Sequence, residues 1–332
     1  MLVENKAAGI CGSDLHYLLG NLRNLVPDRN LPAVLGHENA GVVVETGEGV
    51  TGVKLGDRVA IEPLHGCQEF GQSCPFCRVG QYHLCKSLSH VGIPEVRMIP
   101  GGYGEFSIAH ESRLFSIADT LSFEEAALMD VLAVGVHAVN LARPRPDEVV
   151  VVVGCGAIGL DLIQCLRARG VIRIIAIAKY EFQAEVAKRL GEVETILLNP
   201  GVDPVQEVIQ LTQGRGVNQV YECVGGQTDA VDQAIAMCCP GGVVVGLGVF
   251  PERRPINLLN MQYKEVTLIS SNAYSTAGTR REFQIGLDYL HHGVVSHKHL
   301  ITHRFSPQDY IEAIDTVIHK KDRESIKAVF VR

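Results

Sequence analysis

The sequence predicts an α/β protein of two domains, one built mostly from short strands and the other around a parallel sheet. Its 332 residues correspond to roughly two domains, and 46% hydrophobic with 20% charged residues is the composition of a folded globule. In the first third, short strand-like runs lie between glycine, proline and aspartate turns. From residue 148 onward, valine- and isoleucine-rich runs alternate with helical patterns, which predicts βαβ units and a doubly wound sheet.

The elements follow in chain order from these patterns. The first region has strand-like runs at 40–45 and 58–61. The second region has predicted strands at 149–153, 172–177, 195–198, 219–223, 243–247 and 267–270, with helices between them, for example at 158–168 and 181–190. The tail returns to an extended stretch, a helix at 307–319 and a last strand at 325–331.

The change of texture sets the expected domain boundaries. After Leu121, Ser122 and Glu125 have the spacing of a capping box, in which a hydroxyl and a carboxylate satisfy N–H groups of the first helical turn. We therefore expect residues 1–121 with 299–332 to form the β domain and residues 122–298 to form the parallel-sheet domain.

Charge and hydropathy exclude two classes of partner. Thirty Lys and Arg against 37 Asp and Glu give a net charge of −7 without a strongly basic run, so we expect no nucleic-acid partner. The longest apolar stretch, 149–160, is shorter than the roughly 18 residues of a membrane span and contains three glycines. The N-terminus resembles no export leader, so the ten cysteines are expected in the reducing cytoplasm, where clustered cysteines indicate metal.

A cluster of four cysteines is the strongest single motif. The spacing Cys67-x6-Cys74-x2-Cys77-x7-Cys85 brings four thiolates onto short, glycine-containing loops, as a closed structural zinc site requires. A redox-active pair at Cys74 and Cys77 is the alternative, but such pairs are expected at a helix start beside a βαβ unit, and these follow a loop.

A glycine fingerprint predicts a dinucleotide site. Gly154-x-Gly156-x-x-Gly159 follows a strand of five valines and opens a helix, which is the Rossmann pattern. The first glycine permits the turn, the second admits a pyrophosphate, and the third allows close helix packing. The phosphates would lie on the N–H groups at Ala157 and Ile158, at the start of that helix.

The residues after the second strand favour NADP(H) over NAD(H). An acidic residue there usually accepts hydrogen bonds from the ribose 2′-hydroxyl of NAD, but this chain has Ala178 and Lys179. A small residue followed by a cation would accept a 2′-phosphate. Glu181 stays an alternative acid if the strand end is shifted, and Lys179 could be a solvated surface lysine.

A third constellation, Cys11 with His37 and Glu38, suggests a catalytic zinc. A thiolate, an imidazole and a carboxylate, with one position open for water, is how such a zinc is held. The spacing alone is weak evidence, because a separated Cys and His are often only packed or hydrogen-bonded.

Together these motifs resemble the zinc-dependent medium-chain dehydrogenase/reductase family, of the alcohol, sorbitol and threonine dehydrogenase type. The resemblance covers nearly the whole chain and rests on residues 9–14, 36–38, 56–59, the cysteine cluster, 153–159 and 221–225. It implies a GroES-like β domain that holds two zinc ions, a Rossmann domain that holds the coenzyme, and an active site in the cleft between them. Such relatives carry opening strands before the Cys11 strand, and we expect these to be absent.

The resemblance also implies residue roles. Cys11, His37 and Glu38 match the catalytic-zinc ligands, and Asp130 falls where polyol-type relatives have a glutamate ligand. Asp14 matches the residue that orients the zinc-bound histidine, and Ser13 and His16 match the proton relay. Contact with the nicotinamide is implied for Val224, Leu247 and Ser271.

The implied activity is hydride transfer between NAD(P) and a secondary alcohol of a polyol, sugar or cyclitol, giving the ketone. Asp130 followed by Val131 and Leu132 departs from the Glu-Pro-Leu of polyol enzymes, so an L-threonine 3-dehydrogenase-like substrate is an alternative. A second alternative is a catalytically silent nucleotide-binding protein that zinc only stabilises. A zinc-ribbon protein that binds nucleic acid is disfavoured by the negative net charge. A homodimer or homotetramer is expected.

Overall fold

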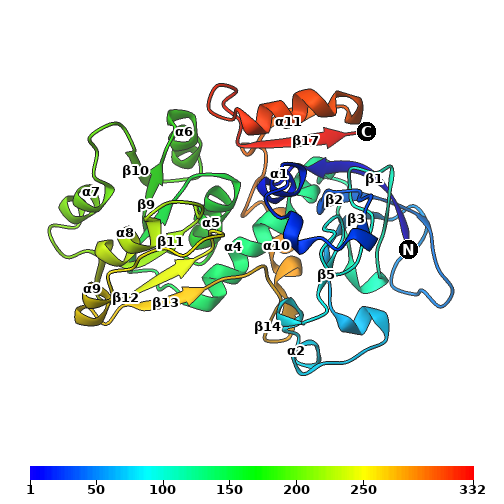
Figure 1. The fold of residues 1–332 in the computed structure, drawn as a ribbon, viewed down its shortest axis with the longest axis horizontal. Helices are drawn as coiled ribbons and strands as arrows, with labels where there is room; N and C mark the ends of the chain where they lie inside the picture. Colours follow the sequence, from blue (N-terminus) through cyan, green and yellow to red (C-terminus); the bar gives the residue numbers. More distant parts are fainter. The chain divides into compact units, whose positions relative to one another are not determined.

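The computed structural model describes residues 1–332, and the chain forms two compact units. The first unit contains Met1–Ala133 and Ser275–Arg332, and the second contains Val134–Tyr274 (Figure 1). The expected α/β class, with a β-rich domain and a doubly wound parallel sheet, is confirmed. No helix is long and apolar enough to cross a membrane.

The unit boundaries differ from the predicted ones at 121/122 and 298/299. Helix α3 (Phe123–Ala127) packs on the strands of the first unit rather than starting the second. Helix α10 (Glu282–His291) also belongs to the first unit, because its buried Phe283 lies 4.7 Å from Phe115 between ring centroids. Helix α4 (Met129–Ala142) runs across the boundary at Ala133, so the change of sequence texture precedes the structural division.

The first unit is built on a sheet of seven strands. The order is β16-β17-β1-β2-β3-β7, with β6 also paired to β1, and only β16 and β17 pair in parallel. The sheet strands are β1 (Leu2–Gly9), β2 (Glu38–Glu45), β3 (Arg58–Ile61), β6 (Phe106–Ile108), β7 (Leu114–Ser116), β16 (Ile301–Phe305) and β17 (Lys327–Val331). Valines on alternating positions, such as Val3, Val43 and Val59, bury one face of this sheet.

The other elements of this unit are short. Besides α3 and α10, this unit contains the helices α1 (Gly12–Leu18), α2 (Pro75–Arg78) and α11 (Tyr310–Ile318). Two small hairpins are formed by β4 (Leu64–His65) with β5 (Ser89–His90) and by β14 (Thr276–Ala277) with β15 (Arg280–Arg281). The Ser122 hydroxyl accepts a hydrogen bond from the N–H of Glu125 at 3.2 Å, which confirms the predicted helix start.

The strand register positions the site. Gly9 at the end of β1 pairs with Glu38 at the start of β2 and with Val329 of β17. Cys11 follows β1 by two residues and His37 immediately precedes β2, so this antiparallel pairing brings the two side chains together although they are distant in sequence.

The second unit is a six-stranded parallel sheet with the order β10-β9-β8-β11-β12-β13, which in chain numbering is the 3-2-1-4-5-6 order of a dinucleotide-binding fold. Its strands are β8 (Val149–Val153), β9 (Arg173–Ala178), β10 (Val193–Leu197), β11 (Val217–Glu222), β12 (Cys238–Gly246) and β13 (Thr267–Ser270). Its helices are α5 (Ala157–Ala168), α6 (Glu181–Arg189), α7 (Pro204–Leu211), α8 (Ala230–Met237) and α9 (Leu258–Tyr263). The predicted strands at 149–153 and 267–270 match β8, a largely buried run of valines in the interior of the sheet, and β13, a mostly exposed edge strand.

Candidate active site

Three side chains that the sequence singled out meet in the first unit. The donor atoms of Cys11, His37 and Glu38 all lie within 4.8 Å of one another. Asp130, at the start of α4, places its Oδ2 4.0 Å from His37 Nε2. A sulfur, an imidazole nitrogen and carboxylate oxygens from three separate segments therefore converge, and this donor set suits zinc.

Asp14 orients the imidazole of His37. Its Oδ1 lies 3.4 Å from His37 Nδ1, which leaves Nε2 to face the other donors. Its Oδ2 accepts hydrogen bonds from the N–H of Cys11 at 2.9 Å and from the hydroxyl of Tyr103 at 2.7 Å. Burial disfavours the charged form of both side chains, but each is outweighed by the opposite charge that faces it. The pKa of Asp14 is therefore lowered beside His37, and the pKa of His37 is raised well above its ordinary value beside Asp14.

Glu38 is held by a buried lysine. Lys327 Nζ donates to Glu38 Oε1 at 2.7 Å and to Oε2 at 2.8 Å, and also to the carbonyl oxygen of Ile10 at 3.3 Å. Both side chains are buried, and a Cβ at Gly9 would come within 2.1 Å of Glu38 Oε2. Burial lowers the pKa of Lys327, yet the Glu38 carboxylate raises it overall, so the pair is ionic. The ion pair holds the Glu38 carboxylate beside Cys11 and His37, where its remaining lone pairs can still reach a metal.

Ser13 and His16, the expected proton relay, lie on α1. Ser13 Oγ is 3.4 Å from His37 Nε2, at the edge of the ligand set. His16 is exposed one turn further along, with Nδ1 3.2 Å from Asn21 Nδ2. The structure therefore brings Ser13 to the site and places His16 toward solvent.

The four cysteines of the predicted structural site also meet. Their sulfur atoms all lie within 4.8 Å of one another, with 3.6 Å from Cys67 to Cys77 and 3.8 Å from Cys74 to Cys85. A tetrahedron with zinc–sulfur bonds of about 2.3 Å has edges of about 3.8 Å, so the four donors fit zinc. The N–H of Cys77 lowers the pKa of the Cys74 thiol to about 7, which favours a thiolate.

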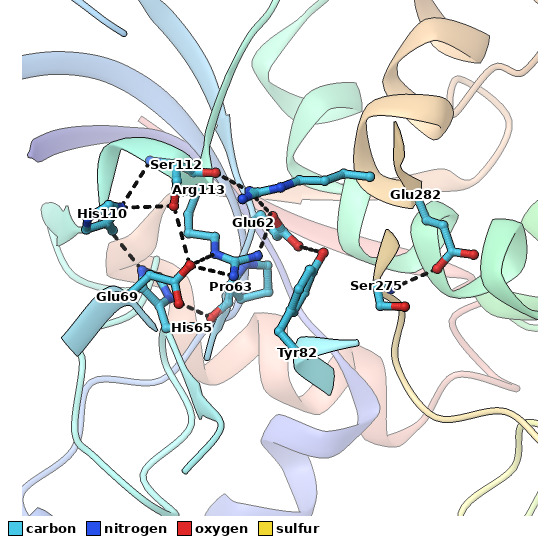
Figure 2. Close-up of polar contacts among 11 residues, drawn as sticks. Glu62, Pro63, His65, Glu69, Tyr82, His110, Ser112, Arg113, Ser275 and Glu282 are labelled. Atoms are coloured by element: carbon cyan, nitrogen blue, oxygen red, sulfur yellow. Dashed lines mark hydrogen bonds and ion pairs between the residues drawn. The ribbon is translucent and has the colours of Figure 1, made fainter. Parts of the chain in front are cut away.

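A buried ionic network connects the cysteine lobe, the segment 67–85 that carries the four cysteines, to the sheet (Figure 2). Arg113 binds Glu62 at 2.9 Å and Glu69 at 2.6 Å, and its side chain is 2% exposed. Tyr82, inside the lobe, donates its hydroxyl to Glu62 at 2.5 Å, and Arg281 reaches the same carboxylate at 3.2 Å. The lobe is therefore anchored by charges that water does not screen.

In the second unit, the glycine fingerprint adopts the expected loop. Gly154 has a φ of 95°, which favours glycine, and a Cβ at Gly159 would lie 1.9 Å from the Gly154 carbonyl oxygen. A Cβ at Gly156 would meet nothing within 4 Å, so the start of α5 at Ala157 and Ile158 is open. This is the space that a pyrophosphate needs at a helix N-terminus.

The other expected coenzyme residues lie at the carboxyl ends of neighbouring strands. Val224 follows β11 and touches the glycine loop, since a Cβ at Gly154 would lie 2.7 Å from its Cγ2. Leu247 donates its N–H to the Glu222 carbonyl at 2.8 Å, and Ser271 donates its N–H to the Gly246 carbonyl at 2.9 Å. The Ser271 Oγ is buried with no hydrogen-bond partner, which fits a site that receives a polar ligand.

The end of β9 has no carboxylate. Ala178 is its last residue and is fully buried, Lys179 is exposed, and Lys179 Nζ lies 5.6 Å from the ring centroid of Tyr180. The strand ends one residue later than predicted, at Ala178, which is too small a shift to include Glu181, and Glu181 begins α6.

Sequence reasoning missed Lys327 and Tyr103. Both contact site residues from far away in the chain, and neither stands in a motif with metal-binding spacing. A lysine within the apolar run of the last predicted strand was the one available signal for Lys327, because buried lysines are almost always paired.

Comparison with known proteins agrees with this geometry. Residues 1–119 match the alcohol dehydrogenase GroES-like domain and residues 157–291 match the zinc-binding dehydrogenase domain. Sorbitol dehydrogenase of Bacillus subtilis is 30% identical over 97% of this chain and 87% of its own length. D-xylulose reductase of Scheffersomyces stipitis is 34% identical over 96% of this chain and 88% of its own length.

A solved structure supports the same class. The crystal structure of 2R,3R-butanediol dehydrogenase from Bacillus subtilis has a TM-score of 0.85 at 29% identity, covering all of this chain and 92% of that one. Fold and ligand sets define a zinc-type, NAD(P)-dependent alcohol dehydrogenase. The chain belongs to the zinc-dependent medium-chain dehydrogenase/reductase family.

Proposed function

We propose that the protein oxidises a secondary hydroxyl of a polyol, sugar or cyclitol to the ketone with NADP, and catalyses the reverse reduction. The observation that carries this proposal is that Cys11 and Asp130 converge on His37, whose imidazole Asp14 holds in one orientation. The substrate class is supported by the relatives, which are a sorbitol dehydrogenase and a D-xylulose reductase.

The first-unit residues fit a catalytic zinc. Cys11, His37 and Asp130 would hold it, with the Glu38 carboxylate beside them as a further donor that Lys327 holds in place. Three protein ligands with one open position is the arrangement of catalytic zinc sites. When bound, zinc lowers the pKa of a substrate hydroxyl and the nicotinamide accepts the hydride.

The chain's own residues move the proton. Ser13 Oγ, 3.4 Å from His37 Nε2, would accept the proton of the substrate hydroxyl while it releases its own toward solvent. His16, exposed one turn along α1, delivers that proton to solvent, and in the reverse direction both residues work the opposite way. Asp14 keeps Nε2 of His37 directed at the metal throughout.

A second zinc is proposed for Cys67, Cys74, Cys77 and Cys85, where four sulfurs leave no position for water. This ion would have a structural role. Two zinc ions per chain are therefore expected.

NADP(H) is proposed in preference to NAD(H). The buried Ala178 offers no carboxylate to a ribose 2′-hydroxyl, and the exposed Lys179 offers a cation to a 2′-phosphate. Gly154, Gly156 and Gly159 would hold the pyrophosphate, while Val224, Leu247 and Ser271 would line the nicotinamide.

The setting of the enzyme is proposed from its surface and thiols. None of the ten cysteines is in a disulfide, which fits a reducing cytoplasm. Strand β13 is an edge of its sheet, and Leu259 and Tyr263 of α9 beside it are 57% and 80% exposed. An unpaired edge with exposed apolar neighbours supports a homodimer, or a homotetramer built from dimers.

The test is a coenzyme and substrate panel on the zinc-loaded protein. Sorbitol, xylitol, myo-inositol and L-threonine are each offered with NADP and with NAD, and nicotinamide absorbance is followed. The expected result is polyol turnover with NADP, together with a rise of about tenfold in the KM for NADP in Lys179→Ala.

The matched control is Lys188→Ala, which removes a lysine that pairs with Glu185 on α6 and should leave the coenzyme KM unchanged. Turnover of L-threonine in place of polyols would establish the threonine dehydrogenase alternative. A single bound zinc ion, in the four-cysteine site, without any turnover would indicate the silent nucleotide-binding protein, because such a protein needs only the structural zinc.

A further inference from the structure

A loop of the first unit, residues 92–101, is fixed beside the proposed metal ligands. Both ends of the loop pack on Gly36, the residue before His37: a Cβ at Gly92 would lie 2.2 Å from the Gly36 carbonyl oxygen, and a Cβ at Gly101 would lie 2.4 Å from it. The Gly92 N–H also donates to the Ile99 carbonyl at 2.8 Å, which closes the loop on itself. The loop is therefore built onto the strand entry that carries His37.

Within this loop, Glu95 is held from two sides. Tyr17 donates its hydroxyl to Glu95 Oε1 at 2.5 Å. The buried Asn30 donates its side-chain amide to the carbonyl oxygens of Pro94 at 2.9 Å and Glu95 at 3.3 Å. The carboxylate is partly buried, so its position is fixed while it stays in reach of a ligand.

Tyr17 places the pair on the side of the proposed metal site. It lies four residues after Ser13 on α1, and residues with this spacing share one helix face. Ser13 faces His37 Nε2 at 3.4 Å, the Tyr17 backbone follows one helical turn, about 5 Å, further along the same face, and the Tyr17 hydroxyl binds Glu95. A polyol carries further hydroxyls along its carbon chain, so a fixed carboxylate on this side can receive one of them while another hydroxyl is at the metal.

We infer that Glu95, positioned by Tyr17, is a specificity-determining residue that accepts a hydrogen bond from a second hydroxyl of the substrate. This inference rests on the proposed function and extends it. Glu95 keeps lone pairs beyond the one that Tyr17 uses, and an ionised carboxylate is an acceptor only. A polyol supplies hydroxyl donors there, whereas a simple secondary alcohol supplies none.

The same carboxylate selects against phosphorylated and carboxylated alcohols. A phosphate beside Glu95 is repelled, and Lys327, the buried cation of the site, already gives hydrogen bonds to both oxygens of Glu38. The preferred substrates are therefore neutral polyols rather than sugar alcohol phosphates.

The experiment compares Glu95→Gln with Glu48→Gln, an exposed glutamate of the same unit that serves as the matched control. Zinc-loaded proteins are assayed with xylitol, 2-butanol and sorbitol 6-phosphate. For Glu95→Gln we expect the KM for xylitol to rise about tenfold with little change in kcat, no change with 2-butanol, and a relative gain with sorbitol 6-phosphate. Tyr17→Phe should move the KM for xylitol in the same direction.

Zinc content and thermal stability of each variant separate recognition from folding, because a merely structural Glu95 would lower both and affect all substrates alike. Equal losses with xylitol and 2-butanol, or no loss with either, would overturn the inference. Turnover of 2-butanol without any preference for xylitol in the wild-type protein would also overturn it and leave the dehydrogenase function intact.

A calorimetric titration of the zinc-loaded protein with xylitol makes the inference testable without turnover. Binding that weakens in Glu95→Gln but not in Glu48→Gln would support the subsite even if every assay of the proposed function failed. Absence of xylitol binding to the wild-type protein would contradict the subsite.

Discussion

The two groups of metal-binding side chains in the first unit are built in opposite ways. The four cysteines come from 19 consecutive residues, 67–85, and all four donors are of one kind. Cys11, His37 and Asp130 come from three distant segments and present three kinds of donor. Around the cysteines the neighbouring charges pair with one another, whereas around Cys11 they pair with the ligands themselves.

This difference separates a structural site from a reactive one. A local set of four thiolates completes its coordination without help from the rest of the fold. The mixed set depends on the sheet register and on Asp14, and its remaining donor, Glu38, is held in position by Lys327. An incomplete set with oriented ligands leaves a position for substrate.

The difference between the two sites is tested most strongly by removing one ligand from each, and this change has the largest expected effect on activity and folding. Cys11→Ala should lower kcat/KM at least about a thousandfold, because zinc supplies several kcal/mol of transition-state stabilisation, and it should leave one zinc per chain and an unchanged fold. Cys77→Ala should instead prevent folding of the lobe. Zinc analysis and circular dichroism distinguish the two; equal loss of structure in both variants would erase the distinction.

The next effect concerns the ionic network under the cysteine lobe. Arg113→Ala leaves Glu62 and Glu69 buried with too little positive charge, so the free energy of unfolding should fall by about 3–5 kcal/mol. The control Arg145→Ala removes an exposed arginine and should cost about 1 kcal/mol or less. Urea denaturation measures both, and similar losses would mean that the network adds nothing to the lobe.

The smallest effect is expected from a change that keeps every ligand in place. Asp14→Asn preserves the shape of the side chain but removes the charge that faces His37, and affinity for the catalytic zinc should fall about 10- to 100-fold. The structural zinc should stay bound. Competition with a chromogenic chelator reads both sites, using Asp119→Asn, whose side chain is 98% exposed, as the control.

The sequence predicted the elements whose patterns are local. The valine run of β8, the Gly154 loop and the Ser122 cap are visible because each depends on neighbours a few residues away. The four cysteines are predictable for the same reason, since their spacing alone keeps them within reach of one ion.

Interactions between distant segments were beyond the sequence patterns. Lys327 and Glu38 are 289 residues apart, and only the pairing of β17 with β1 brings them together. The unit boundaries shifted for a related reason, because α10 follows the second unit in the chain but packs its Phe283 on Phe115 of the first. Tertiary contacts, not local propensity, decide such assignments.

The contact between β1 and β17 has a consequence for synthesis of the chain. Lys327 follows Glu38 by 289 residues, so Glu38 is synthesised almost three hundred residues before its counter-charge. A polypeptide that stops short of this lysine buries a lone carboxylate beside Cys11, or keeps the opening strand solvated. Translation through Lys327 is thereby a condition for a finished site, and chains that stop before this residue would lack the Glu38 counter-charge.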